Sequence, residues 1–407
     1  MLEILLGICL FGLFIAHKKN LGPANPFSIY FSVWLLIITL FYLLQSTFDE
    51  ASGEFIFILI IMKTIALILL FTVKPPAHKL TPEDGYKTGR LVRSKLLLLA
   101  QIIVIAFIPA AYSRAIALSG GFNIFSIGGY ISLRASMTDG GQNFGYISYL
   151  AFLSYVITSL SVYLMRFSIA GIFRASISIA VSLFYVYIGT GRTLGLFLIT
   201  SIIVPLIILR SIRTRWLIIT AGLIAALFIF IALMTAKGIS SEATIAENFI
   251  SFTENLQSYT VAPLLALNKL IQSAPKIEFG NNMFRIIFAI SNFIGLSDHP
   301  PVPLIRNFVF VPNPTNVYTV YDVYFRDFWY FGMIFPPLFL LGHWWIYRRA
   351  QVQGGRWIFI YASTVYALIM QFFQDQYFSL ASSWIQLIAW YMLFVKSSTL
   401  ITKNRLD

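Results

Sequence analysis

A set of arginine residues lies apart from the main basic clusters of the chain, and their side chains suit phosphate chemistry. The guanidinium group is always charged, and its planar fork matches the oxygens of a phosphate. Several such forks converging at one surface would form a diphosphate site that needs no metal ion. Alternatively, each arginine pairs with an acidic residue or caps a helix. The set consists of Arg114, Arg134, Arg192, Arg285, Arg306 and Arg326.

Arg192 lies in a very short turn between two apolar runs. The turn covers residues 189–193 and reads Gly-Thr-Gly-Arg-Thr. Such a turn holds the arginine at membrane depth, where an ionisable group is by default a functional candidate because its burial is costly. The glycines could bring backbone N–H groups close to an anion, although the spacing is not that of a Walker P-loop. The alternative is a structural ion pair with an acid such as Asp327.

Arg134 opens a glycine-rich segment that ends at Gly145. This pattern predicts a loop that carries a cation over a ligand. The alternative is a local ion pair between Arg134 and Asp139.

Aromatic residues collect just before an apolar run, within residues 313–332. Tyrosine suits the headgroup zone of a membrane, and its ring faces also stack on sugar rings. Both interpretations stay open for the three tyrosines. They are Tyr318, Tyr321 and Tyr324.

Candidate acid–base groups lie near these residues. Asp322, Arg326 and Asp327 could share one face of a helix at i, i+4 and i+5. His299, beside Asp298, could take a proton from a sugar hydroxyl as a neutral imidazole. The rival bases are Glu242, Glu247 and Glu254.

The composition restricts the class of protein that positions these residues. Of 407 residues, 58% are hydrophobic and 11% are charged, whereas a soluble domain carries about 25% charged residues. Long apolar runs exclude an outer-membrane barrel. The single cysteine, Cys9, excludes a disulfide framework, and four scattered histidines disfavour a zinc site. We therefore expect no cofactor and no metal ion.

The apolar runs predict an all-α, polytopic integral membrane protein with about 11 transmembrane helices. Lys63 lies within the third run without an obvious partner in the sequence. We treat residues 1–407 as a single membrane domain. The runs cover residues 2–16, 27–44, 55–73, 95–112, 146–165, 172–188, 194–209, 216–234, 327–346, 357–373 and 380–396.

Basic residues mark every second loop, which places these loops in the cytoplasm. This asymmetry accounts for the net charge of +13, so no nucleic-acid partner is expected. The opposite side holds a medium outer loop over 113–145 and a large outer loop over 235–326. In the large loop, periodicity predicts an amphipathic helix at 244–258 and a second short helix at 283–296, either re-entrant or interfacial.

Together these features resemble the oligosaccharide repeat-unit polymerases of bacterial surface polysaccharides, the O-antigen polymerase or Wzy family. The resemblance rests on the late large outer loop, the turn at 189–193, the spacing from Arg134 to Gly145, and the segment from Thr315 to Gly332.

The resemblance implies a GT-C-like, metal-independent membrane glycosyltransferase. It implies polymerisation of repeat units carried on undecaprenyl diphosphate, at the periplasmic or outer face of the bacterial plasma (inner) membrane. Partners would be these glycans, membrane lipid and a separate chain-length regulator protein. Arg192 and Arg134 would bind the diphosphate, with Arg285, Arg306 and Arg326 in support. An early acidic pair, Asp49-Glu50, keeps a metal site open as a minor alternative.

Two rival functions remain open. An O-antigen ligase, or another lipid-linked sugar transferase, performs the same chemistry on a different acceptor. A lipid-linked oligosaccharide flippase is a transporter and would need basic residues along a central cavity, whereas the arginines here cluster towards the outer surface.

A substitution of Arg192 tests its predicted role. Arg192→Lys keeps the charge but loses the planar fork, so we expect it to fail nearly as badly as Arg192→Ala in polysaccharide synthesis at equal protein level. The polysaccharide profile of cells carrying each variant gives the measurement. A fully active lysine variant would remove the bidentate role.

Overall fold

The computed structural model of the protein is almost entirely helical, as the sequence predicts. It describes residues 1–22, 24–76, 80, 82–138, 142, 144–165, 168–209, 257, 259–298 and 300–397. The chain forms two compact units, each assembled from segments that are distant in sequence. The first unit contains Met1–Ala77, Phe249–Tyr347 and Ala367–Ser382, and the second contains His78–Asn248, Arg348–Tyr366 and Ser383–Asp407.

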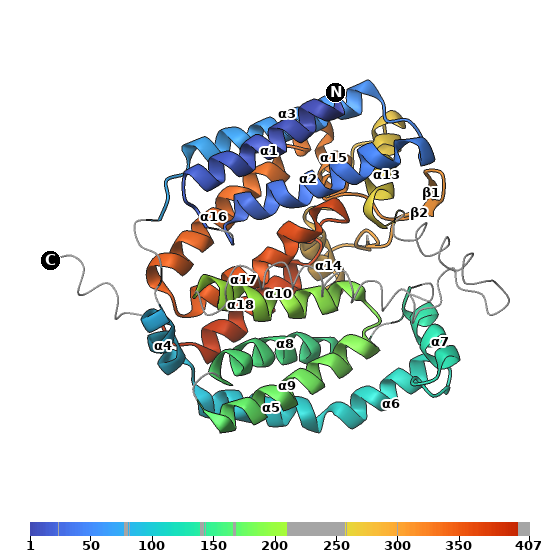
Figure 1. Ribbon diagram of the computed structural model, residues 1–407. Helices are drawn as coiled ribbons and strands as arrows, with labels where there is room; N and C mark the ends of the chain where they lie inside the picture. Colours follow the sequence, from blue (N-terminus) through green and yellow to red (C-terminus); the bar gives the residue numbers. More distant parts are fainter. Residues whose placement is uncertain are drawn as a thin grey trace, which may run out of the picture. The chain divides into compact units, whose positions relative to one another are not determined.

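The first unit joins the N-terminal helices to the segment that follows residue 257 (Figure 1). Its elements include a short antiparallel pair of strands, with Val309 opposite Thr315. They are α1 (Leu2–Lys18), α2 (Pro26–Leu44), η1 (Gln45–Thr47), α3 (Gly53–Thr72), α13 (Ala262–Gln272), α14 (Arg285–Phe293), β1 (Val309–Phe310), β2 (Pro314–Thr315), α15 (Tyr321–Gly332), the first part of α16 (Phe335–Gln353) and η3 (Met370–Phe372).

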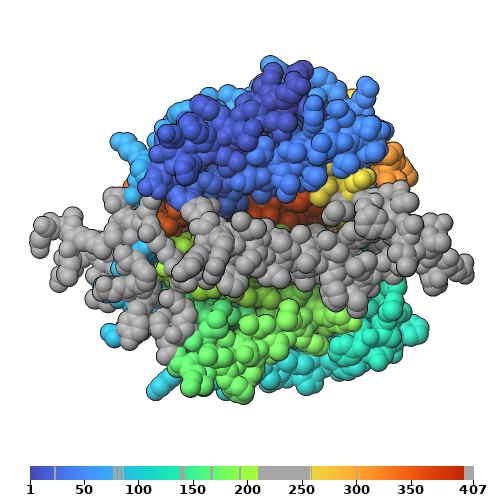
Figure 2. Space-filling model, in the orientation of Figure 1, coloured from blue at the N-terminus to red at the C-terminus, as the bar shows by residue number. Residues whose placement is uncertain are grey.

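Helices α1, α2 and α3 pack side by side in this unit (Figure 1), and α1 and α2 form a closely packed surface (Figure 2). Their starts follow from local capping. Asn25 accepts a hydrogen bond from the backbone of Ser28, and Pro26 pre-sets the first helical residue of α2. Ser52 caps α3 and its hydroxyl also donates to Asn268, which connects α3 to α13.

The second unit is built from the middle of the chain and two C-terminal helices. Residues 348–353 at the end of α16 and the first part of α17 belong to it, whereas α17 ends in the first unit. Its elements are α4 (Pro82–Leu91), α5 (Ser94–Ala106), α6 (Ile108–Leu118), α7 (Ile127–Thr138), α8 (Ile147–Leu164), α9 (Ile169–Ile188), α10 (Arg192–Ile208), most of α17 (Arg356–Ile369) and most of α18 (Ala381–Phe394).

A seam of hydroxyl groups joins α8 to α9 in the second unit. Thr158 lies 2.7 Å from the Ser182 hydroxyl and donates to the carbonyl of Ser178. Ser182 donates to Ser154, and Gln101 of α5 donates to Ser178. Small polar residues allow close helix approach and hydrogen-bond across the interface in lipid. The seam therefore fixes the register of α8 against α9.

Five segments among the described residues are long and apolar enough to cross a membrane, judged by length and composition. Each coincides with a predicted apolar run, which supports the assignment of a helical membrane protein. They are Pro26–Thr47, Gly53–Thr72, Ser94–Leu118, Ile147–Leu164 and Ile169–Ile188.

The other predicted runs do not reach this length or hydropathy. Helices α1 and α10 have 17 residues each, and α17 and α18 have 14 each, whereas a span needs about 20. The run 327–346 is interrupted by a kink within α15, where Trp329 has a φ of 52°, and again between the end of α15 at Gly332 and the start of α16 at Phe335. The run 216–234 lies outside the described residues. The described helices thus support five spans of the predicted 11.

The two loops that the sequence predicts on the outer side contain helices. The medium loop, 113–145, contains the end of α6 and all of α7. The large loop, 235–326, contains α13, α14 and the β1–β2 pair. The second predicted short helix, 283–296, is confirmed as Arg285–Phe293, whereas the predicted amphipathic helix at 244–258 lies outside the described residues apart from residue 257.

Two glycines of α1 provide a matched test of the α1–α2 contact. A Cβ at Gly12 would lie 2.7 Å from the ring of buried Phe31, whereas a Cβ at Gly7 would meet nothing within 4 Å. We expect Gly12→Ala to destabilise the protein by roughly 1–3 kcal/mol through overpacking. Gly7→Ala should be neutral or stabilising, because alanine favours a helix over glycine. Thermal unfolding in detergent measures both variants, and equal melting temperatures would contradict the packing.

Candidate functional site

The candidate site is organised around Asp322, in the first turn of α15. Its Oδ1 lies 2.6 Å from Nε of Arg326, one helical turn away, and its Oδ2 lies 2.8 Å from Nε of Arg306. The Asp322 side chain is 7% exposed, and those of Arg306 and Arg326 are 15% and 18% exposed. One carboxylate therefore holds two guanidinium groups in place. The predicted i, i+4 relation of Asp322 and Arg326 is confirmed.

Arg285 brings a third cation to the same place from the start of α14. Its Nε donates to the carbonyl of Val302 at 2.7 Å. Burial, together with the neighbouring charge of Arg306, lowers the pKa of Arg285. The residues that line the pocket beside this carboxylate thus include two arginines, Arg285 and Arg306, whereas Arg326 contacts the carboxylate without lining the pocket.

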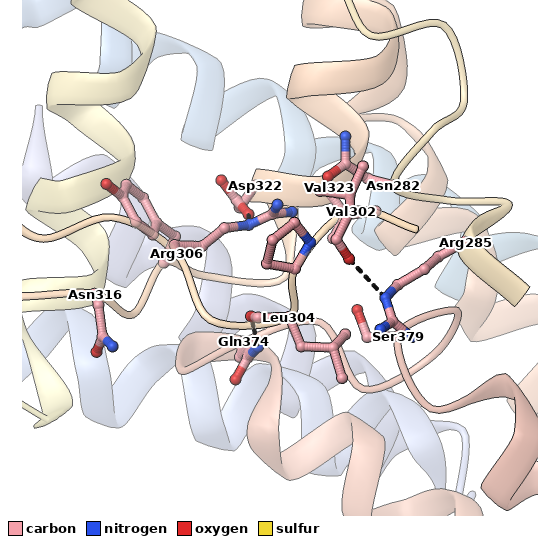
Figure 3. Close-up of a pocket in the computed structure, with 12 residues that line it drawn as sticks. Asn282, Arg285, Val302, Leu304, Arg306, Asn316, Asp322, Val323, Gln374 and Ser379 are labelled. Carbon is pink, nitrogen blue, oxygen red and sulfur yellow. Dashed lines mark hydrogen bonds and ion pairs between the residues drawn. The ribbon is translucent and has the colours of Figure 1, made fainter. Parts of the chain in front are cut away.

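Arg285, Arg306 and Asp322 line a pocket with about 370 Å³ of empty space, part of which is open to solvent. In Figure 3, Arg306 and Arg285 approach it from different segments, and Asp322 lies next to Arg306. The lining residues are Asn282, Arg285, Val302, Pro303, Leu304, Arg306, Asn316, Tyr318, Asp322, Val323, Gln374 and Ser379.

The terminal amino groups of two arginines remain available to a ligand. Each of Arg285 and Arg306 uses its Nε, and none of the described residues hydrogen-bonds their terminal amino groups. For Arg326, burial opposes the charge, but the adjacent Asp322 carboxylate outweighs it and raises the pKa. The arrangement fits a multiply charged anion with several acceptor oxygens.

The three predicted sugar-binding tyrosines take different places. Tyr318 lines the pocket, and its ring lies 5.4 Å from the guanidinium carbon of Arg326. Burial raises the pKa of Tyr318. In contrast, Tyr321 and Tyr324 are fully buried, so their ring faces are covered by protein and cannot stack on a sugar. The sugar-binding prediction is therefore wrong for Tyr321 and Tyr324, and for Tyr318, which is 8% exposed, it stays a prediction.

Asp327, a predicted catalytic acid, holds the segment of the pocket-lining residue Asn282 in place. It is fully buried and accepts hydrogen bonds from the backbone N–H and amide group of Asn282 and from the backbone N–H of Met283. These bonds fix the turn that leads directly into Arg285. Both carboxylate oxygens of Asp327 accept hydrogen bonds within the protein and are closed to solvent. The catalytic prediction for Asp327 is therefore corrected to a positioning role.

Lys63 supports the start of α15, next to Asp322, through aromatic rings. Its Nζ lies 3.1 Å from the ring centroid of Trp34 and donates to the hydroxyls of Tyr30 and Tyr321. Cation–π contacts stabilise a desolvated ammonium group. Lys63 thus neither snorkels nor pairs with one of the described acids. It holds Tyr321, the neighbour of Asp322.

Asp375 is a residue that sequence reasoning missed. It is buried and accepts hydrogen bonds from the hydroxyl of Tyr324 at 2.7 Å and from the backbone of Ser379 at 2.9 Å. Burial raises the pKa of Asp375. Because Gln374 and Ser379 line the pocket, Asp375 shapes one of its walls. The sequence did carry one signal for Asp375, because it is the one acidic residue between the apolar runs 357–373 and 380–396.

The predicted principal arginines, Arg134 and Arg192, belong to the second unit. Arg134 lies in helix α7 and not on a loop, so the prediction of a loop at this residue is wrong, and Arg192 is the first residue of α10. The Thr190 hydroxyl in the turn before α10 contacts the sulfur of Met137 in α7, at 3.8 Å. Helix α7 therefore lies next to the turn that precedes α10. Asp139, the alternative partner of Arg134, lies outside the described residues.

The remaining candidates are dispersed. His299 and the rival bases Glu242, Glu247 and Glu254 lie outside the described residues, and Asp298 is exposed. Asp49 pairs with Lys269 at 2.6 Å, so this member of the early acidic pair has a partner within the protein. Arg114 is exposed on α6.

Comparisons with protein-family models, with curated proteins and with solved structures yield no match.

Removal of the Asp322 charge tests whether this carboxylate holds Arg306 and Arg326 in place. Asp322→Asn leaves two largely buried cations facing each other, and we expect a loss of roughly 2–4 kcal/mol of unfolding free energy. Asp49→Asn is the matched control, because its pair with Lys269 is about 40% exposed and should contribute less than about 1 kcal/mol. Chemical or thermal unfolding in detergent measures both. Equal effects would show that Asp322 does not organise the site.

Proposed function

We propose that this protein polymerises oligosaccharide repeat units carried on undecaprenyl diphosphate into a surface polysaccharide. The proposed place is the outer face of a bacterial plasma membrane. The single observation that supports the proposal most is a pocket that Arg285 and Arg306 line together, with Arg306 held by Asp322.

The charges of this pocket suit the leaving group of the reaction. When the acceptor hydroxyl oxygen bonds to the anomeric carbon, the bond from that carbon to the diphosphate breaks, and negative charge grows on the lipid diphosphate. Cations fixed in advance stabilise such charge without reorganisation. Arg285 and Arg306 offer terminal amino groups for this purpose, and Asp322 keeps Arg306 oriented before the ligand arrives.

The pocket also has a feature suited to a sugar. Tyr318 lines the pocket and is 8% exposed, so a sugar could contact this residue while its diphosphate contacts the arginines. The acceptor hydroxyl needs a base, and His299 beside Asp298 remains the proposed group. Arg134 and Arg192 remain proposed diphosphate ligands, and the GT-C-like fold with about 11 spans remains part of the proposal.

A transferase with another acceptor and a flippase remain the alternatives, and surface polysaccharide separates them. Cells with the gene deleted and then restored are compared on a polysaccharide gel. A polymerase predicts collapse of the ladder to a single repeat unit on its usual anchor, because export and ligation continue. Long chains stranded on undecaprenyl lipid would indicate a ligase, and loss of all external chains would indicate a flippase.

Arg285 provides the sharpest variant for this assay. Its removal leaves no carboxylate without a partner, because its Nε bonds to a backbone carbonyl. We expect Arg285→Ala to reduce polymer about 100-fold or more, as loss of one oriented charge at a transition state does. Arg285→Lys should restore little of it, because the fork is lost.

The matched control for Arg285 is Lys276→Ala. It removes one positive charge from an exposed position in the same unit, away from the pocket. We expect a normal ladder from this variant at equal protein level. A normal ladder from Arg285→Ala as well would contradict the assignment of the pocket.

A further inference from the structure

Helix α14 has the reverse of the arrangement expected on a water-soluble protein. Its polar end faces the protein, because Arg285 bonds to Val302 and lines the pocket (Figure 3). Its apolar side is open, with Ile287, Ile290 and Ile294 each exposed by more than half. At about 100° per residue these three isoleucines fall within an arc of roughly 60°, on the side opposite Arg285.

The exposed apolar surface continues beyond the helix at both ends. Phe279 precedes α14, and Phe293 and Leu296 lie at its end and just after it, all largely exposed. Burial of such surface contributes about 25 cal/mol per Å², so leaving it in water would be costly. Some apolar medium must therefore cover it.

The level of α14 along the neighbouring span points to the membrane interface. Tyr330 donates from its hydroxyl to Glu54, in the first turn of the span-length helix α3. Trp329 is also exposed beside it, and tyrosine and tryptophan mark the headgroup level. The turn before α14 is bound to this same region, because the backbone N–H of Glu278 donates to the carbonyl of Arg326.

We infer that the isoleucine face of α14 lies in the outer leaflet of the bilayer, among the lipid acyl chains, as an interfacial helix. Nine residues extend about 14 Å, too short to cross a hydrocarbon core of about 30 Å. Amphipathic helices with this apolar character lie in the interface plane. The sequence left re-entrant and interfacial interpretations of this helix open. The exposed isoleucines and the inward-facing Arg285 favour the interfacial interpretation.

This position has a consequence for the pocket. Arg285 lies on the same short helix, on the side away from the acyl chains, so its guanidinium group stands at the depth of lipid phosphates. A ligand whose diphosphate is joined to a long apolar chain could then reach the arginines without leaving the membrane. The inference itself does not depend on the proposed function.

Fluorescence quenching in lipid vesicles tests the inference directly. The full-length protein carries Ile290→Cys labelled with a small environment-sensitive dye, in phosphatidylcholine vesicles that contain lipid with a nitroxide near the top of the acyl chain. The native Cys9 is buried, and the unsubstituted protein serves as the labelling blank. Asn292→Cys is the matched control, because it is exposed but lies near Arg285 in the helical projection.

We expect quenching by the nitroxide lipid to be at least about twofold stronger at position 290 than at position 292, with the reverse order for aqueous iodide. Ile287→Cys, on the same face, repeats the measurement if the first variant folds poorly. Strong iodide quenching at 287 and 290 would place the face in water and overturn the inference. Protection from both quenchers would mean that protein covers it, either a second copy or another segment of this chain, and would overturn it equally.

Discussion

The site depends on one carboxylate that neutralises two arginines in a largely buried place. Without Asp322, the guanidinium groups of Arg306 and Arg326 would repel each other at low effective dielectric. With it, the start of α15 and the segment around residue 306 must stay together. Among the charged residues that line the pocket, Arg285 and Arg306 outnumber the one acid, Asp322, and such a positive surplus is the property that an anion-binding pocket needs.

Three buried polar residues hold the segments around this carboxylate in place. Lys63 holds Tyr321 through the aromatic rings of α2, Asp327 fixes the turn before Arg285, and Asp375 fixes the segment that contributes Ser379. In each case a polar group that would be costly to bury alone is fully used by its neighbours. Such residues restrain the pocket without touching its contents.

Local patterns predicted much of this organisation. The apolar runs among the described residues are helical over most of their length, and the spacing of Asp322 and Arg326 predicted their contact. Helices α4, α7 and α13 lie outside these runs and were not predicted. The convergence of Arg285, Arg306 and Arg326 was also expected as part of a larger set. What sequence could not give were contacts between distant segments, such as Lys63 with Tyr321, or the burial of Tyr324 against Asp375. These depend on tertiary packing, which periodicity does not encode.

The salt bridge between Lys269 and Asp49 is more exposed to solvent than the salt bridges of Asp322. Lys269 joins Asp49 to the carbonyl of Phe310, and both charged side chains are about 40% exposed. At physiological salt the Debye length is about 8 Å, so such a contact weakens as ionic strength rises. The attachment of the β1–β2 pair should thus respond to the salinity of its surroundings, while the shielded pocket charges keep their geometry across the same range.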